Sequence, residues 1–466
     1  MKNPDSRPGI PSSGSKKTRA KSPSPQVRGD TRGRIALIGA GFAGLGMARA
    51  LKKRGIEFDH FEKENAVGGN WRHGVYDTAH IISSRKTTEY GDFPMPEHYP
   101  DFPSAKQMAD YLDSYADHFR LRETILFNTE VADAAPEGDA WRVTLASGRE
   151  FMYDGVIVAN GHHWDCRFPE YPGDFTGKWM HSKQYKNPSV LKNKRVLVIG
   201  GGNSACDVAV EAARFARESH ISLRRGYWFM PKTVFGAPTV ELMKAWMPPW
   251  LLRLITRLML RVVVGDYRKY GLQKPDHRPF DKHPTINSQL LYFLKHGTIT
   301  PHGDVARFEG RDVIFQNGER KTFDVVICGT GFHVSFPFLR PGVLSYTNGM
   351  PDLVGGAIPL GRRNLFLFGL GQPRYGAGPL ITAGAELVCD AVETQRRMDM
   401  PIGDVLRKLG QPLVRSWVMD PFAVLRRIRM GRRIMPFLPR LARFYARKTK
   451  PKGSEKLPVA APSAGS

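Results

Sequence analysis

The sequence predicts an α/β fold with two Rossmann-like dinucleotide-binding domains, because one unit of strand, glycine-rich loop and helix occurs twice along the chain. In the first unit, the apolar run IALI from Ile35 leads into G-x-G-x-x-G and then a helical stretch, residues 45–51. In the second unit, RVLVI from Arg195 leads into G-x-G-x-x-A and a helical stretch, residues 204–216. One such loop is often an ordinary βα turn, but two copies in the same context indicate two nucleotide sites.

Each glycine of the first loop has its own geometric role. Gly39 permits a tight turn, Gly41 lets the backbone approach a pyrophosphate, and Gly44 lets the helix pack on the strand. The next strand, residues 56–61, ends at Glu62, where a carboxylate is expected to accept a hydrogen bond from a ribose hydroxyl. The loop therefore predicts an FAD or NAD site that comprises Gly39, Ala40, Gly41, Phe42, Ala43, Gly44 and Glu62.

The second loop differs from the first at the end of the following strand, HISLRR, where Arg224 and Arg225 replace the acid. A carboxylate there would repel a 2′-phosphate, whereas guanidinium groups would bind it. The second loop is therefore assigned to NADPH and the first to FAD. The predicted NADPH-binding residues are Gly200, Gly202, Asn203, Ser204, Ala205, Arg224 and Arg225, of which residues 203–205 donate backbone N–H groups to the pyrophosphate.

The distance between the loops predicts that the second domain is inserted within the first.

Composition supports a globular enzyme, because 41% of the 466 residues are hydrophobic. The tails have almost no large apolar side chains and are expected to be disordered. The expected segments are a basic tail (1–32), the FAD domain in two parts (33–185 and 326–400), the NADPH domain (186–325) with an insertion (236–284), a basic amphipathic segment (401–452) and a second tail (453–466).

The cysteines and the charge restrict the function. The four cysteines contain no C-x-x-C pair, so a disulfide oxidoreductase is excluded and a reducing, cytoplasmic setting is expected. The net charge of +25 suggests nucleic acid as a partner, but the sequence contains no DNA- or RNA-binding motif. A nucleic-acid partner is therefore not expected. Basic residues interleaved with apolar ones in residues 422–452 suit contact with an anionic membrane, at its inner face.

A second stretch, WLLRLITRLMLRVVVG from Trp250, is apolar but too charged and too short to cross a bilayer. Arg253, Arg257 and Arg261 recur every four residues and so share one face of a helix. Two interpretations remain open from the sequence. The helix either lies on a membrane surface or packs on its own protein with the arginines in water.

Four further motifs resemble one known family. They are Gly68-Gly69-Asn70-Trp71, Asp92-Phe93-Pro94, Asn160-Gly161-His162, and F-x-G-x-x-x-H-x-x-x-Y at Phe175, Gly177, His181 and Tyr185. The last is similar to the signature of the flavin-containing monooxygenases, and the similarity extends over residues 34–390. The related Baeyer–Villiger enzymes usually carry tryptophan in place of Tyr185, so the resemblance is to the branch that oxygenates heteroatoms.

The resemblance implies an NADPH- and FAD-dependent monooxygenase. NADPH would reduce FAD, O2 would add to the flavin as a C4a-hydroperoxide, and nitrogen or sulfur in a small organic substrate would take the distal oxygen, with no metal. Gly68 and Gly69 would let the backbone lie close to the flavin phosphates, and Trp71 would cover the cofactor. Asn70 is also expected to bind the cofactor, and the Val131 backbone would hold adenine. His181 is expected either to orient the loop before the second domain as a structural hydrogen bonder or to transfer a proton.

One departure from the family pattern affects this expectation. Where the family has Ser or Thr followed by an asparagine that contacts flavin and nicotinamide, this chain reads IISSRK from Ile81. Ser83 and Ser84 are the candidate hydroxyl donors there. This departure leaves open a flavin oxidase or reductase that does not oxygenate. A Baeyer–Villiger enzyme also stays open, and the basic ends of the chain leave open a membrane-surface protein with a retired nucleotide fold. A homodimer is also open.

Overall fold

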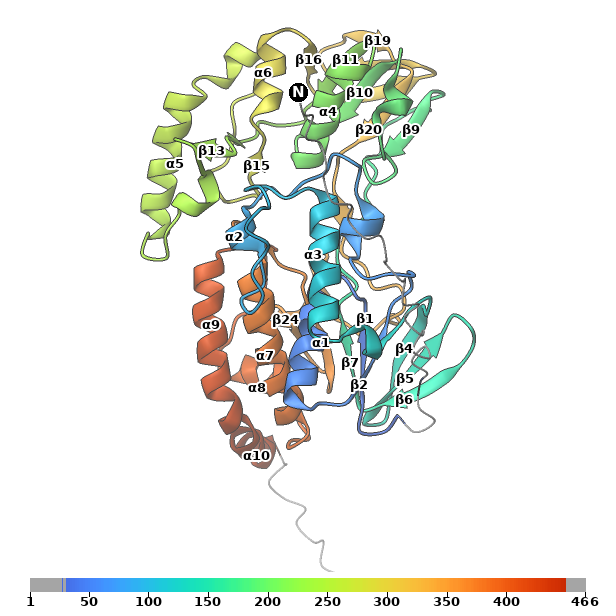
Figure 1. The fold of residues 1–466 in the computed structure, drawn as a ribbon, viewed down its shortest axis with the longest axis vertical. Helices are drawn as coiled ribbons and strands as arrows, with labels where there is room; N and C mark the ends of the chain where they lie inside the picture. Colours follow the sequence, from blue (N-terminus) through green and yellow to red (C-terminus); the bar gives the residue numbers. More distant parts are fainter. Residues whose placement is uncertain (1–26, 28–30, 450–466) are drawn as a thin grey trace, which may run out of the picture.

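The computed structural model describes Val27 and residues 31–449, which form two parallel five-stranded sheets, one above the other in Figure 1. The tails expected at residues 1–32 and 453–466 lie almost entirely outside the described residues. Two separate sheets, each with its own buried cluster of apolar side chains, confirm the α/β fold.

The first sheet has the strand order β26-β7-β1-β2-β3. Its central strand β1 (Ile35–Ile38) is completely buried and pairs in parallel with β2 (Phe58–Phe61) and β7 (Gly155–Val158). At one edge lies β3 (Ile125–Leu126) and at the other β26 (Leu365–Leu367), which comes from much later in the chain. This sheet is therefore assembled from two separate parts of the sequence.

The second sheet has the strand order β16-β11-β10-β20-β9. Strand β10 (Arg195–Ile199) lies between β11 (Glu218–Ser222) and β20 (Val325–Cys328), and β16 (Ile299–His302) forms one edge. The other edge is β9 (Lys178–His181), which was expected in the first domain. The second sheet thus begins before residue 185 and ends after residue 325, because β9 and β20 pair with each other through backbone hydrogen bonds that no side-chain pattern reveals.

The two domains repeat the same plan. In the first, α1 (Phe42–Arg54) follows β1, and in the second, α4 (Asn203–Phe215) follows β10. Each domain also carries a three-stranded antiparallel sheet just before its last central strand. These sheets are β4 (Val131–Glu137), β5 (Ala140–Leu145) and β6 (Glu150–Tyr153), and β17 (Val305–Glu309), β18 (Asp312–Phe315) and β19 (Arg320–Thr322).

The expected insertion forms a subdomain with a small core of its own. It is bracketed by β12 (Phe229–Met230) and β15 (Thr285–Ile286), which pair in parallel, and its longest element is α5 (Pro249–Val263). Tyr375 from the first domain and Phe422 from the C-terminal segment join its apolar cluster. Its other elements are β13 (Thr233–Val234), β14 (Ala237–Pro238), η4 (Thr239–Leu242) and η5 (Tyr267–Tyr270), and α6 (Gln289–Lys295) follows it.

The C-terminal helices pack on the first domain. Helix α9 (Pro421–Ile434) contacts α7 (Gly378–Gln395), and α10 (Leu438–Thr449) contacts α8 (Ile402–Lys408). Part of the apolar surface of the segment expected to meet a membrane is thus buried against the protein, while its exposed surface carries Met430, Phe437 and Phe444 among basic residues. The buried side chains are those of Ile428, Met435, Leu438 and Ala442.

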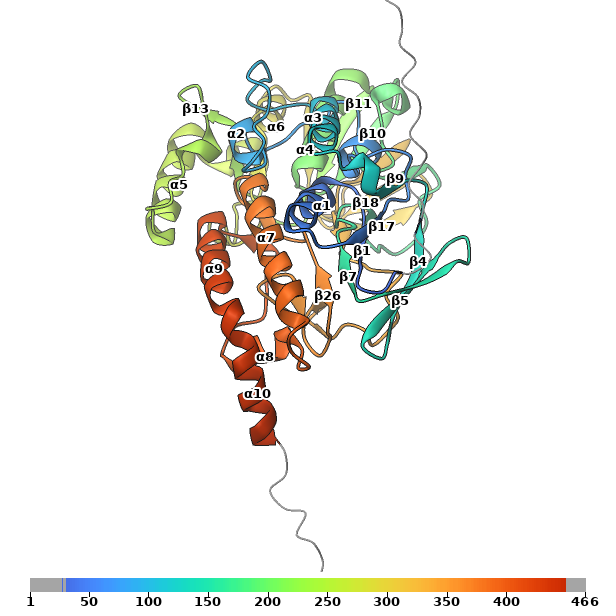
Figure 2. The same ribbon diagram turned by 60° about the horizontal axis from the view of Figure 1, so that its bottom comes forward.

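Figures 1 and 2 both place α5 and α9 along the same side of the molecule, away from the antiparallel sheet β4-β5-β6. Within residues 31–449, no helix combines the length and the hydropathy that crossing a bilayer requires. The remaining helical elements are η1 (Asn70–Gly74), α2 (Arg85–Thr88), α3 (Ala105–His118), η2 (Arg122–Thr124), η3 (Pro188–Leu191) and η6 (Met435–Phe437). The remaining short strands are β8 (Asp165–Cys166), β21 (Phe332–His333), β22 (Tyr346–Thr347), β23 (Met350–Pro351), β24 (Leu353–Val354), β25 (Ile358–Pro359), β27 (Gln372–Pro373) and β28 (Val418–Met419).

Candidate functional site

The first glycine-rich loop turns sharply at the carboxyl end of β1. Gly39 has φ +100°, and a Cβ there would lie 2.6 Å from the carbonyl oxygen of Ala159. A Cβ on Gly44 would lie 1.7 Å from the carbonyl oxygen of Gly39. Both positions therefore require glycine, one for the turn and one for the contact between helix and strand.

Gly41 differs from these two glycines because its Cβ position is open. The nearest heavy atom to that position is the Cα of Gly69, at 3.5 Å. Gly69, with φ +51°, belongs to the pair Gly68-Gly69 and faces this open position. The Gly68 N–H donates to the Ala40 carbonyl at 3.2 Å. Helix α1 begins here with neither a side-chain cap nor an acidic residue in its first turn, so residues 42–44 offer free N–H groups to an anion. This cradle fits the pyrophosphate of FAD.

Glu62 lies beside the same loop and is only 6% exposed. Its carboxylate accepts hydrogen bonds from the Ala40 N–H at 2.6 Å and from the Glu64 N–H at 2.9 Å, while burial raises its pKa. The Thr129 N–H donates to the Glu62 carbonyl at 2.9 Å, which brings the start of β4 and buried Val131 next to the loop. The acid and the valine strand predicted from sequence are therefore neighbours.

Trp71 lies between the two domains. It belongs to η1, which begins at Asn70 directly after the glycine pair. Its side chain packs against the apolar cores of both domains. A residue that follows the FAD cradle thus also contacts the second domain.

His60 supports the first loop and was not identified from sequence. It is completely buried on β2, and its Nε2 lies 2.9 Å from the Gly39 carbonyl, to which the neutral ring donates. Burial lowers the pKa of His60 from 6.5 to about 4. A histidine within the short strand FDHF was the only signal available.

This burial predicts acid sensitivity. The unfolded chain takes up a proton on His60 below pH 6.5, whereas the folded protein resists uptake until about pH 4. The free energy of unfolding should therefore be fully present above pH 6.5 and fall by about 3 kcal/mol as the pH drops to 4. Urea unfolding at pH 7 and pH 4.5 should show a smaller loss for His60→Gln, whose amide keeps the donor without titrating. An equal loss in both proteins would contradict this.

The second loop repeats the geometry of the first. Gly200 has φ +123°, and its Cβ would lie 2.5 Å from the Gly329 carbonyl oxygen, whereas the nearest atom to a Cβ on Gly202 is 3.9 Å away. Helix α4 begins at Asn203 with no acidic residue in its first turn, which contains Ser204 and Ala205. The Asn203 side chain itself accepts from the Ile286 N–H at 2.7 Å, so only its backbone faces a ligand freely.

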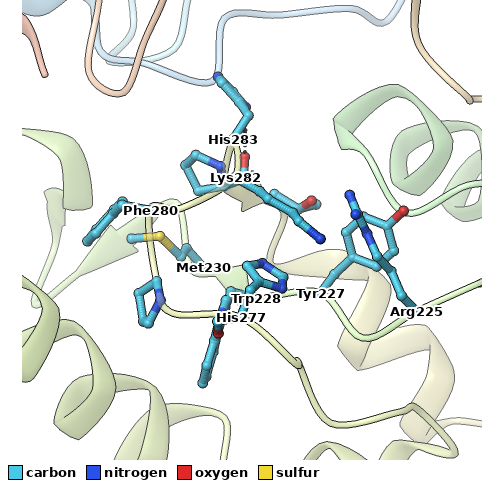
Figure 3. Close-up of a pocket in the computed structure, with 11 residues that line it drawn as sticks. Arg225, Tyr227, Trp228, Met230, His277, Phe280, Lys282 and His283 are labelled. Carbon is cyan, nitrogen blue, oxygen red and sulfur yellow. Dashed lines mark hydrogen bonds between the residues drawn. The ribbon is translucent and has the colours of Figure 1, made fainter. Parts of the chain in front are cut away.

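The two predicted arginines follow β11, which ends at Ser222. Arg225 is half-buried, with its Cζ 5.3 Å from the centre of the Tyr227 ring, whereas Arg224 is exposed. Figure 3 shows Arg225 and Tyr227 side by side at one end of a small hollow. The insertion supplies Lys282 to the same hollow, a contribution that the sequence could not place because it depends on how the insertion folds back.

The signature segment forms β9 and the turn after it. His181 is fully buried, its Nε2 lies 3.0 Å from the Gly331 carbonyl, and its Nδ1 accepts from the Lys183 N–H at 3.2 Å. Both ring nitrogens are thus bonded to backbone, and burial lowers the pKa of the imidazole. This geometry suits a neutral histidine that holds the loop after β20 in place.

Ser83 and Ser84 lie just before α2. The Ser83 hydroxyl is 2.6 Å from the Thr88 hydroxyl, and the side chain is half-buried. Ser84 is fully buried and caps α2, where its hydroxyl accepts from the Thr87 N–H at 3.3 Å. The two serines therefore have different surroundings, although they are adjacent in sequence.

Known proteins share this arrangement. Residues 32–387 match the sequence profile described as Flavin-binding monooxygenase-like. Flavin-containing monooxygenase 5 of Homo sapiens is 33% identical over 375 residues, which cover 74% of this chain and 70% of the relative. Dimethylaniline monooxygenase (N-oxide-forming) 2 of Oryctolagus cuniculus is 30% identical over 376 residues, which cover 73% and 69%. A solved flavin-containing monooxygenase from Stenotrophomonas maltophilia has the same fold, with a TM-score of 0.60 at 22% identity over 78% of this chain and 98% of that chain.

The matched residues include both glycine-rich loops and the segment from Phe175 to Tyr185. The chain therefore belongs to the flavin-containing monooxygenase family, and it is a flavin-dependent oxidoreductase whose cofactors are FAD and NADPH.

Proposed function

We propose that this flavoprotein transfers one oxygen atom from O2 to a nitrogen or sulfur atom of a small organic substrate. The observation that carries the proposal is the placement of two glycine-rich loops, each at the carboxyl end of its own sheet, with Trp71 packed against the cores of both domains. The relative from Oryctolagus cuniculus, named as N-oxide-forming, supports nitrogen as one acceptor.

The first loop would hold FAD, which accepts hydride from NADPH and activates O2 when bound. Gly41 and Gly69 leave room for the pyrophosphate, and the N–H groups of residues 42–44 face it. Glu62 would accept from a ribose hydroxyl, since each carboxylate oxygen has a second lone pair. The Val131 backbone and the side chains of Asn70 and Trp71 would complete the FAD site.

The second loop would hold NADPH. Gly200 and Gly202 shape the loop, and the backbone of Asn203, Ser204 and Ala205 would bind the pyrophosphate. Arg225, stacked beside Tyr227, would bind the 2′-phosphate within the hollow, and Arg224 would add a second charge from outside it.

Three polar side chains near the domain contact are given separate roles. Ser83 would donate its hydroxyl to the flavin, because a hydroxyl can rotate away from its bond to Thr88. Ser84 holds this segment by capping α2. His181 holds the loop at Gly331. Oxygen transfer in this protein would then depend on one hydroxyl donor and on exclusion of water, in place of a side-chain amide.

Product analysis tests the proposal. The FAD-loaded protein would be supplied with NADPH, O2 and tertiary amines, thioethers or ketones, and product and H2O2 would be measured per NADPH consumed. We expect N-oxides or S-oxides to form in step with NADPH oxidation. Esters from ketones would assign the Baeyer–Villiger reaction instead, and H2O2 as the sole product with every substrate would assign an oxidase.

We also propose that α5 contacts an anionic membrane surface. The helix packs on the protein through one buried face and exposes an apolar stripe on the other. The buried face consists of Leu252, Thr256 and Leu260, and the stripe consists of Trp250 (66% exposed), Leu254 (48%), Leu258 (56%) and Val262 (85%). Arg257 and Arg261 are exposed beside the stripe, while Arg253 pairs with Asp281. Apolar side chains bordered by arginines suit the boundary between anionic headgroups and acyl chains.

Vesicle binding tests this contact. Leu258→Glu should lower the affinity for phosphatidylserine vesicles by about tenfold or more. The change removes apolar area that the membrane would bury, and it adds a charge of the same sign as the lipid headgroups. Phe215→Glu, at a 46% exposed site on α4, is the matched control and should bind as the wild type does. Equal binding by both variants would overturn the proposal. A homodimer that Leu258→Glu dissociates in the absence of lipid would assign the stripe to a second copy of this chain.

A further inference from the structure

Two acidic side chains of α4 lie where the nucleotide domains meet, outside both loops. The first is Asp207. It accepts a hydrogen bond from the Tyr76 hydroxyl at 2.8 Å and another from Asn287 Nδ2 at 2.8 Å. Tyr76, only 6% exposed, belongs to the FAD domain, whereas Asn287 follows the insertion. Asp207 therefore joins its own helix to two other parts of the chain.

The second acid, Glu211, is one helical turn further along α4 and 5% exposed. It accepts from the Thr78 hydroxyl at 2.5 Å and from the hydroxyl of Tyr185, the fully buried tyrosine of the signature segment. Both carboxylates are thus bonded across the domain contact, to residues two apart in the segment that follows η1.

The ends of this connection lie close to the two nucleotide loops. Helix α4 begins at Asn203 in the second loop, so a rotation of α4 moves that loop directly. Tyr76 comes shortly after Trp71 and η1, which begin at the FAD cradle. The second glycine-rich loop is also held by β15, the strand that follows the insertion, because Thr285 Oγ1 donates to the Gly201 carbonyl at 2.7 Å.

Stability alone does not account for two buried acids. Burial raises the pKa of Asp207, and apolar side chains of similar size would fill the space without the desolvation cost. Hydrogen bonds differ from apolar contacts in that they are directional, so they favour one orientation of the helix. Lys232 and His80 contact each other beside Asp207, which places a positive charge near the acid.

We propose that Asp207 and Glu211 are positioning residues for hydride transfer. Through Tyr76 and Thr78 they set the orientation of α4 relative to the FAD domain, and hence the approach of nicotinamide to flavin. The inference rests on the proposed NADPH site at the second loop. Hydride transfer requires donor and acceptor within about 3–3.5 Å, and a misplacement of about 1 Å can lower a rate about 100-fold.

The test removes only the donors on the FAD-domain side. In Tyr76→Phe/Thr78→Val, we expect the anaerobic rate of flavin reduction by NADPH to fall about 10- to 100-fold, while the Kd for NADPH changes less than about twofold. Deuterated NADPH should give a larger isotope effect on turnover in the variant than in the wild type. Without bound nucleotides, hydrogen–deuterium exchange of residues 76–80 should be faster in the variant than in the wild type. This measurement reports on the contact independently of activity.

Tyr153→Phe is the matched control. Tyr153 is also fully buried, and its hydroxyl donates to Asp59 at 2.8 Å, but this bond lies within the FAD domain. The control should retain the rate of flavin reduction even where it loses stability. An unchanged rate in Tyr76→Phe/Thr78→Val, or an equal fall in Tyr153→Phe, would overturn the inference. A wild-type flavin that NADPH does not reduce would instead overturn the proposed function.

Discussion

Replacement of Gly41 by alanine is expected to produce a folded protein that binds FAD about 10- to 100-fold more weakly, because a methyl group would displace a charge-assisted bond between backbone and phosphate. Gly41 has φ −81° and ψ −168°, which alanine adopts without strain. The Cβ would have no neighbour closer than 3.5 Å. FAD content after purification and titration of the apoprotein with FAD measure the effect.

Two other glycine substitutions give the limits for this comparison. Gly303→Ala adds the same methyl group where nothing lies within 4 Å, and it should retain FAD fully. Gly44→Ala places its Cβ 1.7 Å from a backbone oxygen and should instead impair folding. If Gly41→Ala purified with a full complement of FAD, the first loop would not be the pyrophosphate site.

Removal of Arg224 and Arg225 is expected to change the nucleotide preference. Each charge-assisted bond to the 2′-phosphate contributes about 1.5–3 kcal/mol, so each alanine should raise the Kd for NADPH about 10- to 100-fold and leave the Kd for NADH unchanged. The effect of Arg225 should be the larger, because it is half-buried beside Tyr227 whereas Arg224 is exposed. Titrations with both nucleotides check this.

Arg217→Ala is the control for charge. Arg217 is 71% exposed and precedes β11, whereas the predicted pair follows the carboxyl end of that strand. The same charge is lost, so a general electrostatic effect would weaken NADPH binding in both variants. A preference for NADPH that survives the loss of both predicted arginines would remove the 2′-phosphate assignment.

The sequence was sufficient for the features that depend on local backbone geometry. The second central strand was predicted with its observed bounds, Arg195–Ile199, because a run of branched apolar residues before glycine has few alternatives. Gly39 and Gly200 both have positive φ, as the turn at their positions requires. The strand that closes the first sheet, β26 (Leu365–Leu367), lies within residues 326–400, which the sequence assigned to the same domain as β1.

Features that depend on partners distant in sequence could not be predicted in this way. The amphipathic pattern of residues 422–452 fits a membrane or a protein core equally well, and only the fold reveals that Ile428, Met435, Leu438 and Ala442 are buried in the core of the first domain. The reverse holds for α5, where the outward face is apolar. An amphipathic helix specifies that one face is buried but not what covers it.

Motif, composition and resemblance thus determined the two-domain α/β fold, the pair of nucleotide loops and the family, because these depend on residues close together in the chain. Tertiary structure alone decided which hydroxyl groups the acids of α4 meet across the domains, that His60 supports the Gly39 turn, and that Lys282 reaches the hollow beside Arg225. The physical reason is that burial and hydrogen-bond partners arise from long-range packing, whereas a sequence pattern constrains only the backbone that it occupies.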